Sequence, residues 1–286
     1  MLDLRMDDTF CWPCETSSAF RTRLEFVYHA LLPVKPRKVL DMGCGTGEHL
    51  TQYIARLFPS AAVYGVDSDE KSINFAKLKS ARQNLRFSSD IPENVFFDSI
   101  IASEVLEHVQ NPYHVLLSLR SKLRNDGLLV ITVPNGYGCS EFMAATESLL
   151  HLSGALKVLR KARQVLKPGR KPRDARPDTL AISPHINFFR FKKLLRMFSE
   201  CGFDLMAYQG RMFLHNFICS VVIDKSESLS KINADLGKVL PACMVSDWMF
   251  ALKKNQGVAF TGHKVYQRNL YERMRKFLNQ KRYRLS

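Results

Sequence analysis

The stretch Val39-Leu40-Asp41-Met42-Gly43-Cys44-Gly45-Thr46-Gly47-Glu48 decides the fold of this chain. An apolar strand ends on an acid and passes into glycines at positions 43, 45 and 47. Glycine lacks Cβ, so the turn can adopt positive φ and ligand atoms can approach the main chain closely. Helix-forming residues 48–58 follow, so the amides of a helix N-terminus are expected to point into the same pocket.

The spacing of these glycines separates the nucleotide-binding classes. A dinucleotide fingerprint reads G-x-G-x-x-G and a phosphate loop ends in G-K-[ST], whereas this run reads D-x-G-x-G-x-G with no lysine after it. The pattern therefore predicts a flat ligand without phosphates to cradle.

Further apolar segments end on polar residues in a regular order. Residues 62–66 end on Asp67, where an acid accepts hydrogen bonds from ribose hydroxyls in a Rossmann-like unit. Later segments run into Ser88-Ser89-Asp90-Ile91, into Glu104-Val105-Leu106-Glu107-His108 and into Pro134-Asn135-Gly136.

This succession resembles the motifs of the class I S-adenosylmethionine-dependent methyltransferases, with specific motifs over residues 36–134 and a looser match over 185–254. The resemblance implies that S-adenosyl-L-methionine is the cofactor. It implies a cofactor site made of Asp41, Gly43, Cys44, Gly45, Gly47, Asp67, Ser68, Asp90, Ile91, Ser103 and Glu104.

Strand and helix patterns alternate, which indicates an α/β fold with a parallel sheet and helices on both faces. We expect helices over 69–82, capped by Ser68, over 112–124 and over 190–201, and late strands over 203–208 and 247–252. The resemblance implies a Rossmann-like, doubly wound, seven-stranded sheet, mostly parallel with an antiparallel last strand.

The domain organisation follows from where the alternation is interrupted. We expect an N-terminal helical cap over 1–35, with an amphipathic helix from Glu15 to Leu32, and a methyltransferase domain over 36–254. Insertions at about 136–184 and 211–244 leave the sheet on its ligand side, so they are predicted to form a lid that sets substrate specificity. The first contains an amphipathic helical pattern from Glu147 to Leu166, and a basic extension over 255–286 closes the chain.

The net charge of +15 is concentrated in two segments. Residues 151–180 hold nine Lys or Arg against two Asp, and residues 255–286 hold eight against one Glu, so each segment has a net charge of +7. We interpret both as segments that the fold does not need. They are expected either to improve solubility or to contact RNA, an anionic membrane surface or an acidic substrate.

Localisation is predicted to be cytoplasmic, with peripheral association at a membrane as a second option. No run approaches the roughly 18 to 20 apolar residues of a membrane span, and the N-terminus lacks the order of a signal peptide. Seven scattered cysteines favour reduced thiols, and Cys11-Trp12-Pro13-Cys14 lacks the second pair of a zinc site.

Glu104, Glu107 and His108 stand at i, i+3 and i+4, so they share one face if this segment is a helical turn. Such a face suits either a metal or acid/base chemistry. The run, with His185 before an aromatic pair, resembles the ubiquinone-biosynthesis O-methyltransferases and the small-RNA 3′-terminal 2′-O-methyltransferases. The resemblance implies a divalent cation, Mg²⁺, held by Glu104, Glu107, His108 and His185, which would lower the pKa of an acceptor hydroxyl.

Two alternatives to the metal stay open at this point. His108 or His185 can act as a general base, with Glu107 as its partner, or these side chains have structural roles only.

Three functions follow from these patterns. The first is O-methylation of a small-molecule, lipid-linked or sugar hydroxyl by in-line methyl transfer. The second is metal-dependent 2′-O-methylation of RNA ribose, and the third is a non-catalytic adaptor that keeps the fold. The acceptor and the oligomeric state are not specified by the sequence.

Overall fold

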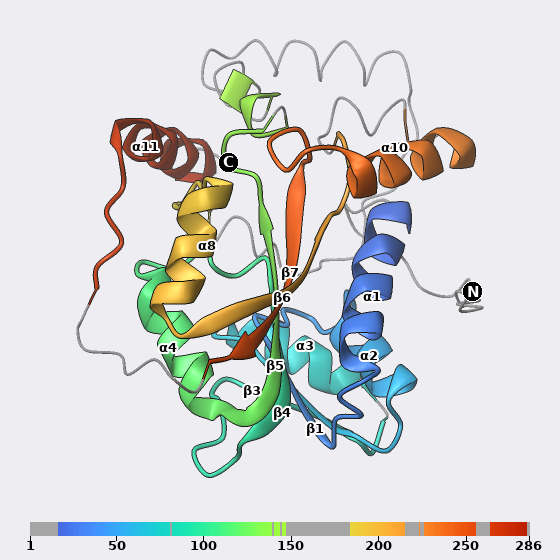
Figure 1. Ribbon diagram of the computed structural model, residues 1–286. Coiled ribbons are helices and arrows are strands. Elements are labelled where there is room, and N and C mark those ends of the chain that lie inside the picture. Colours follow the sequence, from blue (N-terminus) through green and yellow to red (C-terminus); the bar gives the residue numbers. More distant parts are fainter. Residues whose placement is uncertain are drawn as a thin grey trace.

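The computed structural model describes residues 17–80, 82–138, 140–143, 145–146, 184–214, 223, 226–255 and 264–284. Its centre is a seven-stranded sheet in the order β3-β2-β1-β4-β5-β7-β6 (Figure 1). The strands are β1 (Lys38–Met42), β2 (Ala62–Val66), β3 (Leu85–Ser88), β4 (Phe97–Ser103), β5 (Leu123–Pro134), β6 (Phe203–Gly210) and β7 (Asp247–Lys254). Strands β1 to β5 pair in parallel, and β7 is antiparallel to both β5 and β6. The predicted fold class is confirmed.

Helices cover both faces of this sheet (Figure 1). The first face carries α1 (Ser17–Leu31), α2 (Thr51–Leu57) and α3 (Glu70–Lys79), and the second carries α4 (Pro112–Lys122) and α8 (Phe191–Glu200). Two more helices, α10 (Glu227–Val239) and α11 (Leu270–Arg284), lie at the end of the sheet where β5 ends and β7 begins (Figure 1).

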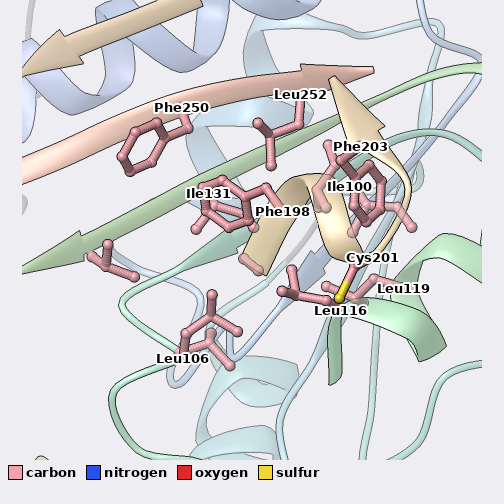
Figure 2. Packing of buried hydrophobic residues seen from close by; sticks show 14 of the residues in the cluster. Ile100, Leu106, Leu116, Leu119, Ile131, Phe198, Cys201, Phe203, Phe250 and Leu252 are labelled. Carbon is pink, nitrogen blue, oxygen red and sulfur yellow. The ribbon is translucent and has the colours of Figure 1, made fainter. Parts of the chain in front are cut away.

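Alternate residues of the central strands pack into two separate hydrophobic cores, one on each face of the sheet. In β4, Ile100 packs with α4 and α8, whereas its neighbour Ile101 packs with α1 and α2. Figure 2 shows the first of these cores, in which Ile131 and Phe250 from the sheet lie close to Phe198 of α8. The period of two is what a sheet buried on both faces requires, because successive side chains point to opposite faces.

Helix α3 is capped by a different residue from the one predicted. Its N-cap is Asp69, whose side chain accepts a hydrogen bond from the backbone N–H of Ser72 at 3.1 Å. Ser68 is therefore not the cap, since the carboxylate one residue later has the β-region backbone that capping needs. At α4 the cap is Asn111, followed by Pro112 as the first helical residue.

The C-terminal segment corrects one interpretation of the charge pattern. Residues 270–284 form α11, in which Glu272, Arg275 and Asn279 are buried. This part of the basic extension is therefore docked on the fold. The other segment, 151–180, and the predicted helix from Glu147 to Leu166 lie outside the described residues. Among the helices of the described ranges, none is long and apolar enough to cross a bilayer.

Candidate functional site

A cavity of about 670 Å³ opens at the carboxyl ends of β1, β2 and β4. Every predicted cofactor-binding residue except Gly47 lines it. The strand-end rule for open α/β sheets places a ligand crevice at this edge, so the sequence pattern and the cavity agree on the location.

The glycine turn has the backbone that its sequence predicts. Gly43, Gly45 and Gly47 all have positive φ, at 73°, 53° and 72°. A Cβ on Gly47 would lie 2.5 Å from Cζ of Phe87, so this glycine allows close packing against β3 and does not face the cavity. A Cβ on Gly45 would meet no atom within 4 Å. Gly45 therefore leaves space that a ligand can occupy against bare main chain.

Asp67 holds this turn in place. Its Oδ2 accepts a hydrogen bond from the N–H of Gly45 at 2.8 Å, and its Oδ1 accepts one from the N–H of Asp69 at 2.9 Å. Each carboxylate oxygen has a further lone pair, so the side chain can still accept from ligand hydroxyls. Asp90 is exposed beside the cavity and accepts from the hydroxyl of Ser89 at 2.9 Å.

Asp41 lies under the turn and is buried. It accepts a hydrogen bond from the hydroxyl of Thr51 at 2.6 Å. Burial raises the pKa of Asp41 to about 7, against the opposing effects of the Thr51 hydrogen bond and the Arg23 charge.

Arg23 is a cavity residue that sequence reasoning missed. It extends from α1, lines the cavity and donates a hydrogen bond to the hydroxyl of Ser103 at 3.2 Å. A signal was available, because Arg23 stands within the apolar stripe formed by Phe20, Leu24 and Val27. A buried cation in such a stripe needs a polar partner.

The segment after β4 departs from the expected geometry. Glu104 has a φ of 56°, and its N–H donates to the carbonyl of Thr132 at 2.9 Å, so it continues the sheet edge and not a helix. Its Oε1 accepts from the Thr132 hydroxyl at 2.8 Å. The turn closes only later, where the N–H of His108 donates to the carbonyl of Val105 at 3.0 Å. The expected common helical face of Glu104, Glu107 and His108 is therefore wrong.

Glu107, His108 and His185 nevertheless come together. One ligand atom from each lies within 4.8 Å of the others, and Glu104 is outside this set. The two imidazole rings meet edge to face with centroids 4.8 Å apart, and Nε2 of His108 is 3.9 Å from Oε1 of Glu107. His108 lines the cavity, whereas Glu107 and His185 lie behind it.

Glu107 is fully buried, and neither of its carboxylate oxygens has a hydrogen-bond partner among the described residues. Burial and the nearby charge of Glu104 raise the pKa of Glu107 well above its usual range. An unsatisfied buried carboxyl is costly, and its position in a cluster with two imidazoles makes Glu107 a candidate functional group.

A second layer of side chains holds His185. Its Nδ1 is 3.4 Å from Oε1 of Glu141, and the other carboxylate oxygen of Glu141 accepts from Arg275 of α11 at 2.8 Å. Asn279 of the same helix donates to the His185 carbonyl at 3.2 Å. Glu141 and Arg275 were not singled out from the sequence, because neither belongs to a motif.

This environment predicts a pH-dependent stability. Burial lowers the pKa of His185, but Glu141 outweighs it and the pKa rises to about 9. A raised pKa means that the pair stabilises the fold fully below about pH 6.5 and that this contribution is lost as the pH rises through 9. We expect the free energy of unfolding to fall by at most about 3 kcal/mol over that window.

Urea unfolding at pH 6.5, 8 and 9.5 measures this loss. The variant His185→Gln cannot titrate, so its stability should change less over the same window. If the free energy of unfolding changed equally with pH in the wild type and the variant, His185 would not be held as an imidazolium.

Comparisons with known proteins agree with this geometry. A family model described as a methyltransferase domain matches residues 18–208. Trans-aconitate 2-methyltransferase of Deinococcus radiodurans is 37% identical over 108 residues, which cover 37% of this chain and 41% of that protein. The mitochondrial ubiquinone biosynthesis O-methyltransferase of Candida albicans is 36% identical over 106 residues, covering 34% of this chain and 32% of that protein. The chain thus spans less than half the length of these curated relatives.

Among solved structures, PKMT2 from Rickettsia typhi in complex with AdoHcy has a TM-score of 0.52 at 16% identity, with 87% of this chain and 56% of that chain covered. This likeness shows a shared fold. The family match extends over more than half of the chain and includes the glycine turn, Asp67 and the Glu107 segment. The chain belongs to the S-adenosylmethionine-dependent methyltransferases.

Proposed function

We propose that this enzyme transfers the methyl group of S-adenosyl-L-methionine in line to a hydroxyl of a small-molecule, lipid-linked or sugar acceptor. The observation that carries the proposal is the cluster of buried Glu107 with half-buried His108 and His185 beside the cavity. Methyl transfer from a sulfonium needs mainly positioning and exclusion of water. A hydroxyl acceptor needs more, because its proton must be removed or its oxygen polarised. This cluster supplies an imidazole that can remove the proton, and side chains that can hold a polarising cation.

His108 is the proposed general base. It lines the cavity with 19% of its side chain exposed, so an acceptor can reach it. His185 is less suited to that role, because Glu141 keeps its pKa at about 9 and the imidazole is already protonated at neutral pH. Glu107 is therefore proposed to orient His108 and, by ionising, to balance its charge when it takes the acceptor proton, whereas His185 is a positioning residue.

A divalent cation is the alternative way to activate the hydroxyl. The orphaned carboxylate of Glu107 fits a cation, and the contact between His185 and Glu141 is the outer-shell partner that a ligating imidazole commonly has. Two imidazoles with one carboxylate suit a first-row transition ion better than Mg²⁺, which prefers oxygen ligands. If a cation binds, Glu107, His108 and His185 would hold it, and it would lower the pKa of the acceptor hydroxyl.

The other two candidate functions have weaker support. The intact glycine turn and the family membership argue against a non-catalytic adaptor. RNA ribose methylation has the basic charge in its favour, but the outward face of α11 centres on Leu270, Met274 and Phe277, which do not contact phosphates. We propose a cytoplasmic location, which the free thiols of Cys44, Cys201 and Cys243 support.

A transfer assay with methyl-labelled S-adenosyl-L-methionine tests the proposed chemistry. Acceptor panels should contain phenols, sugars, carboxylic acids, amines and short RNAs at equal concentration. We expect label on a hydroxyl oxygen, in a bond that resists mild alkali, unlike a methyl ester. Label on nitrogen, on carbon or on a carboxylate would contradict the proposal.

Arg275 provides a test of the second layer. Replacing it by methionine removes the partner of Glu141, so His185 loses its fixed orientation and we expect kcat to fall by about tenfold or more. The KM for the cofactor should stay the same, because Arg275 does not line the cavity. The matched control is Arg273→Met, which lies on the exposed side of the same helix. Equal kcat for the two variants, measured by the same transfer assay, would remove Arg275 from the site.

A further inference from the structure

Helix α10 is amphipathic in the reverse sense. Its inward side carries Ser230, Asn233 and Ala234, which are all buried. Its outward side carries large apolar residues spaced by three or four positions: Leu229 (46% exposed), Ile232 (55%), Leu236 (37%) and Val239 (77%). A surface helix in water normally turns such a stripe toward the core.

Helix α11 has the same reversal. Glu272, Arg275 and Asn279 face inward, whereas Leu270 (73% exposed), Met274 (58%) and Phe277 (56%) face outward at intervals of four and three residues. The stripes of α10 and α11 are directed away from the core, and the two together are called the apolar face. Both lie at one end of the molecule, beyond the end of β5 (Figure 1).

The reversal is fixed by specific inward contacts. In α10, the Asn233 side chain donates to the carbonyl of Leu214 at 2.8 Å and accepts from its N–H at 2.9 Å. In α11, Arg275 donates a hydrogen bond to the carboxylate of Glu141, and Asn279 donates one to the carbonyl of His185. Rotating either helix to bury its apolar stripe would break these buried bonds, so the stripes stay outside. An exposed apolar stripe of this kind along a surface helix indicates an interaction site.

We propose that the apolar face of α10 and α11 docks on an anionic lipid bilayer, with both stripes in the headgroup region. The charges next to the two stripes support an anionic bilayer as the partner. Exposed cations flank the stripes at Lys231, Arg273 and Lys281, whereas the outward Asp235 is paired with Lys238 at 3.0 Å. In α11 the acid Glu272 is fully buried. Apolar residues flanked by Lys and Arg are what an interfacial helix presents to anionic lipid.

Other occupants fit this face less well. A second copy would bring the cationic α11 of each copy against the other, which like-charge repulsion opposes. A nucleic acid would need stacking or phosphate-binding groups at the centre of the face, where the side chains are mostly aliphatic.

The docking face is linked to the methyltransferase site through α11. The outward side of this helix would contact lipid, while its inward side holds Glu141 and the backbone of His185. The cavity lies at the same end of the parallel strands, so the bilayer would hold a lipid-borne acceptor at that end of the molecule. This last consequence rests on the proposed function, whereas the docking itself does not.

Vesicle flotation of the full chain, without cofactor or acceptor, tests the docking. We expect the protein to float with vesicles of phosphatidylcholine containing about 30% phosphatidylglycerol, and to float poorly with phosphatidylcholine alone or at 1 M salt. The double variants Ile232→Glu/Val239→Glu and Met274→Glu/Phe277→Glu should each lower the partition coefficient at least about tenfold. Their melting temperatures should stay near that of the wild type, because these side chains are exposed.

The matched control is Leu78→Glu on α3, where the side chain is 86% exposed and lies outside the apolar face. It should bind vesicles like the wild type. The proposal is overturned if the wild type does not float with anionic vesicles, or if the double variants float as well as it does. It is also overturned if light scattering shows a dimer that the same variants dissociate, or if short RNA binds and competes with the vesicles for the same residues.

Discussion

Replacing Gly45 by leucine is expected to abolish measurable binding of S-adenosylhomocysteine while the protein stays folded. A Cβ at this position would meet no protein atom within 4 Å, and Gly45 lines the cavity, so leucine is expected to take space that the ligand needs. We expect affinity to fall by about 100-fold or more, measured by calorimetry. The left-handed backbone at Gly45, with φ of 53°, adds a stability cost of roughly 1–2 kcal/mol.

Alanine variants separate the two effects. Gly45→Ala and Gly202→Ala both place a Cβ on a residue with positive φ, and Gly202 directly follows the C-cap of α8, away from the cavity. Gly202→Ala should lose at least as much stability, because its Cβ would also lie 2.8 Å from Nε of Arg120, and only Gly45→Ala should lose affinity. If Gly45→Leu bound the ligand like the wild type, the cofactor would lie elsewhere and the assignment of the cavity would fail.

The cofactor half of the site was predictable because its residues follow one another at strand ends. Gly45 and Asp67 are 22 residues apart, yet parallel pairing of β1 with β2 brings their strand ends to the same edge of the sheet. The order of apolar runs and polar ends is therefore enough to predict which residues meet at the cofactor site, and no knowledge of distant contacts is needed.

The acceptor half depends on contacts that no local pattern encodes. Glu141 and Arg275 are separated by 134 positions, and their pairing is set by how α11 docks on the fold. Charge counting indicated that the C-terminal segment was dispensable for the fold, because a buried and an exposed arginine look alike in sequence. The outward apolar stripe of α11 could not be predicted for the same reason, because the sequence does not say which side of the helix is buried.

Glu104 shows where local reasoning gave the wrong geometry. Its spacing to Glu107 and His108 suits a helix, but the carbonyl and hydroxyl of Thr132 on β5 hold Glu104 at the sheet edge. The resulting positive φ separates it from the cluster of Glu107, His108 and His185. Tertiary hydrogen bonds outweighed a spacing that is only a weak indicator of helix.

Replacing Glu107 by glutamine is expected to lower kcat by about 10²- to 10⁴-fold, because the amide cannot ionise to balance the charge of His108 when it takes the acceptor proton. Affinity for S-adenosylhomocysteine should not change, since Glu107 does not line the cavity. Burial already disfavours the ionised form of Glu107, so glutamine resembles the neutral acid and the melting temperature should hold or rise. The loss of activity would then be chemical and not a consequence of unfolding.

The same variant separates the two ways of activating a hydroxyl. If His108 acts as a base without metal, the wild type keeps its activity after dialysis against a chelator. The matched control for Glu107→Gln is Glu70→Gln, the same substitution at an exposed position on α3. If a cation is required, chelation should reduce the wild type to the level of Glu107→Gln, and Mn²⁺ or Co²⁺ should restore it more fully than Mg²⁺, because two of the three ligands are imidazoles. A Glu107→Gln variant with wild-type kcat would eliminate both routes, since a buried carboxyl with no hydrogen-bond partner would then have no part in the reaction.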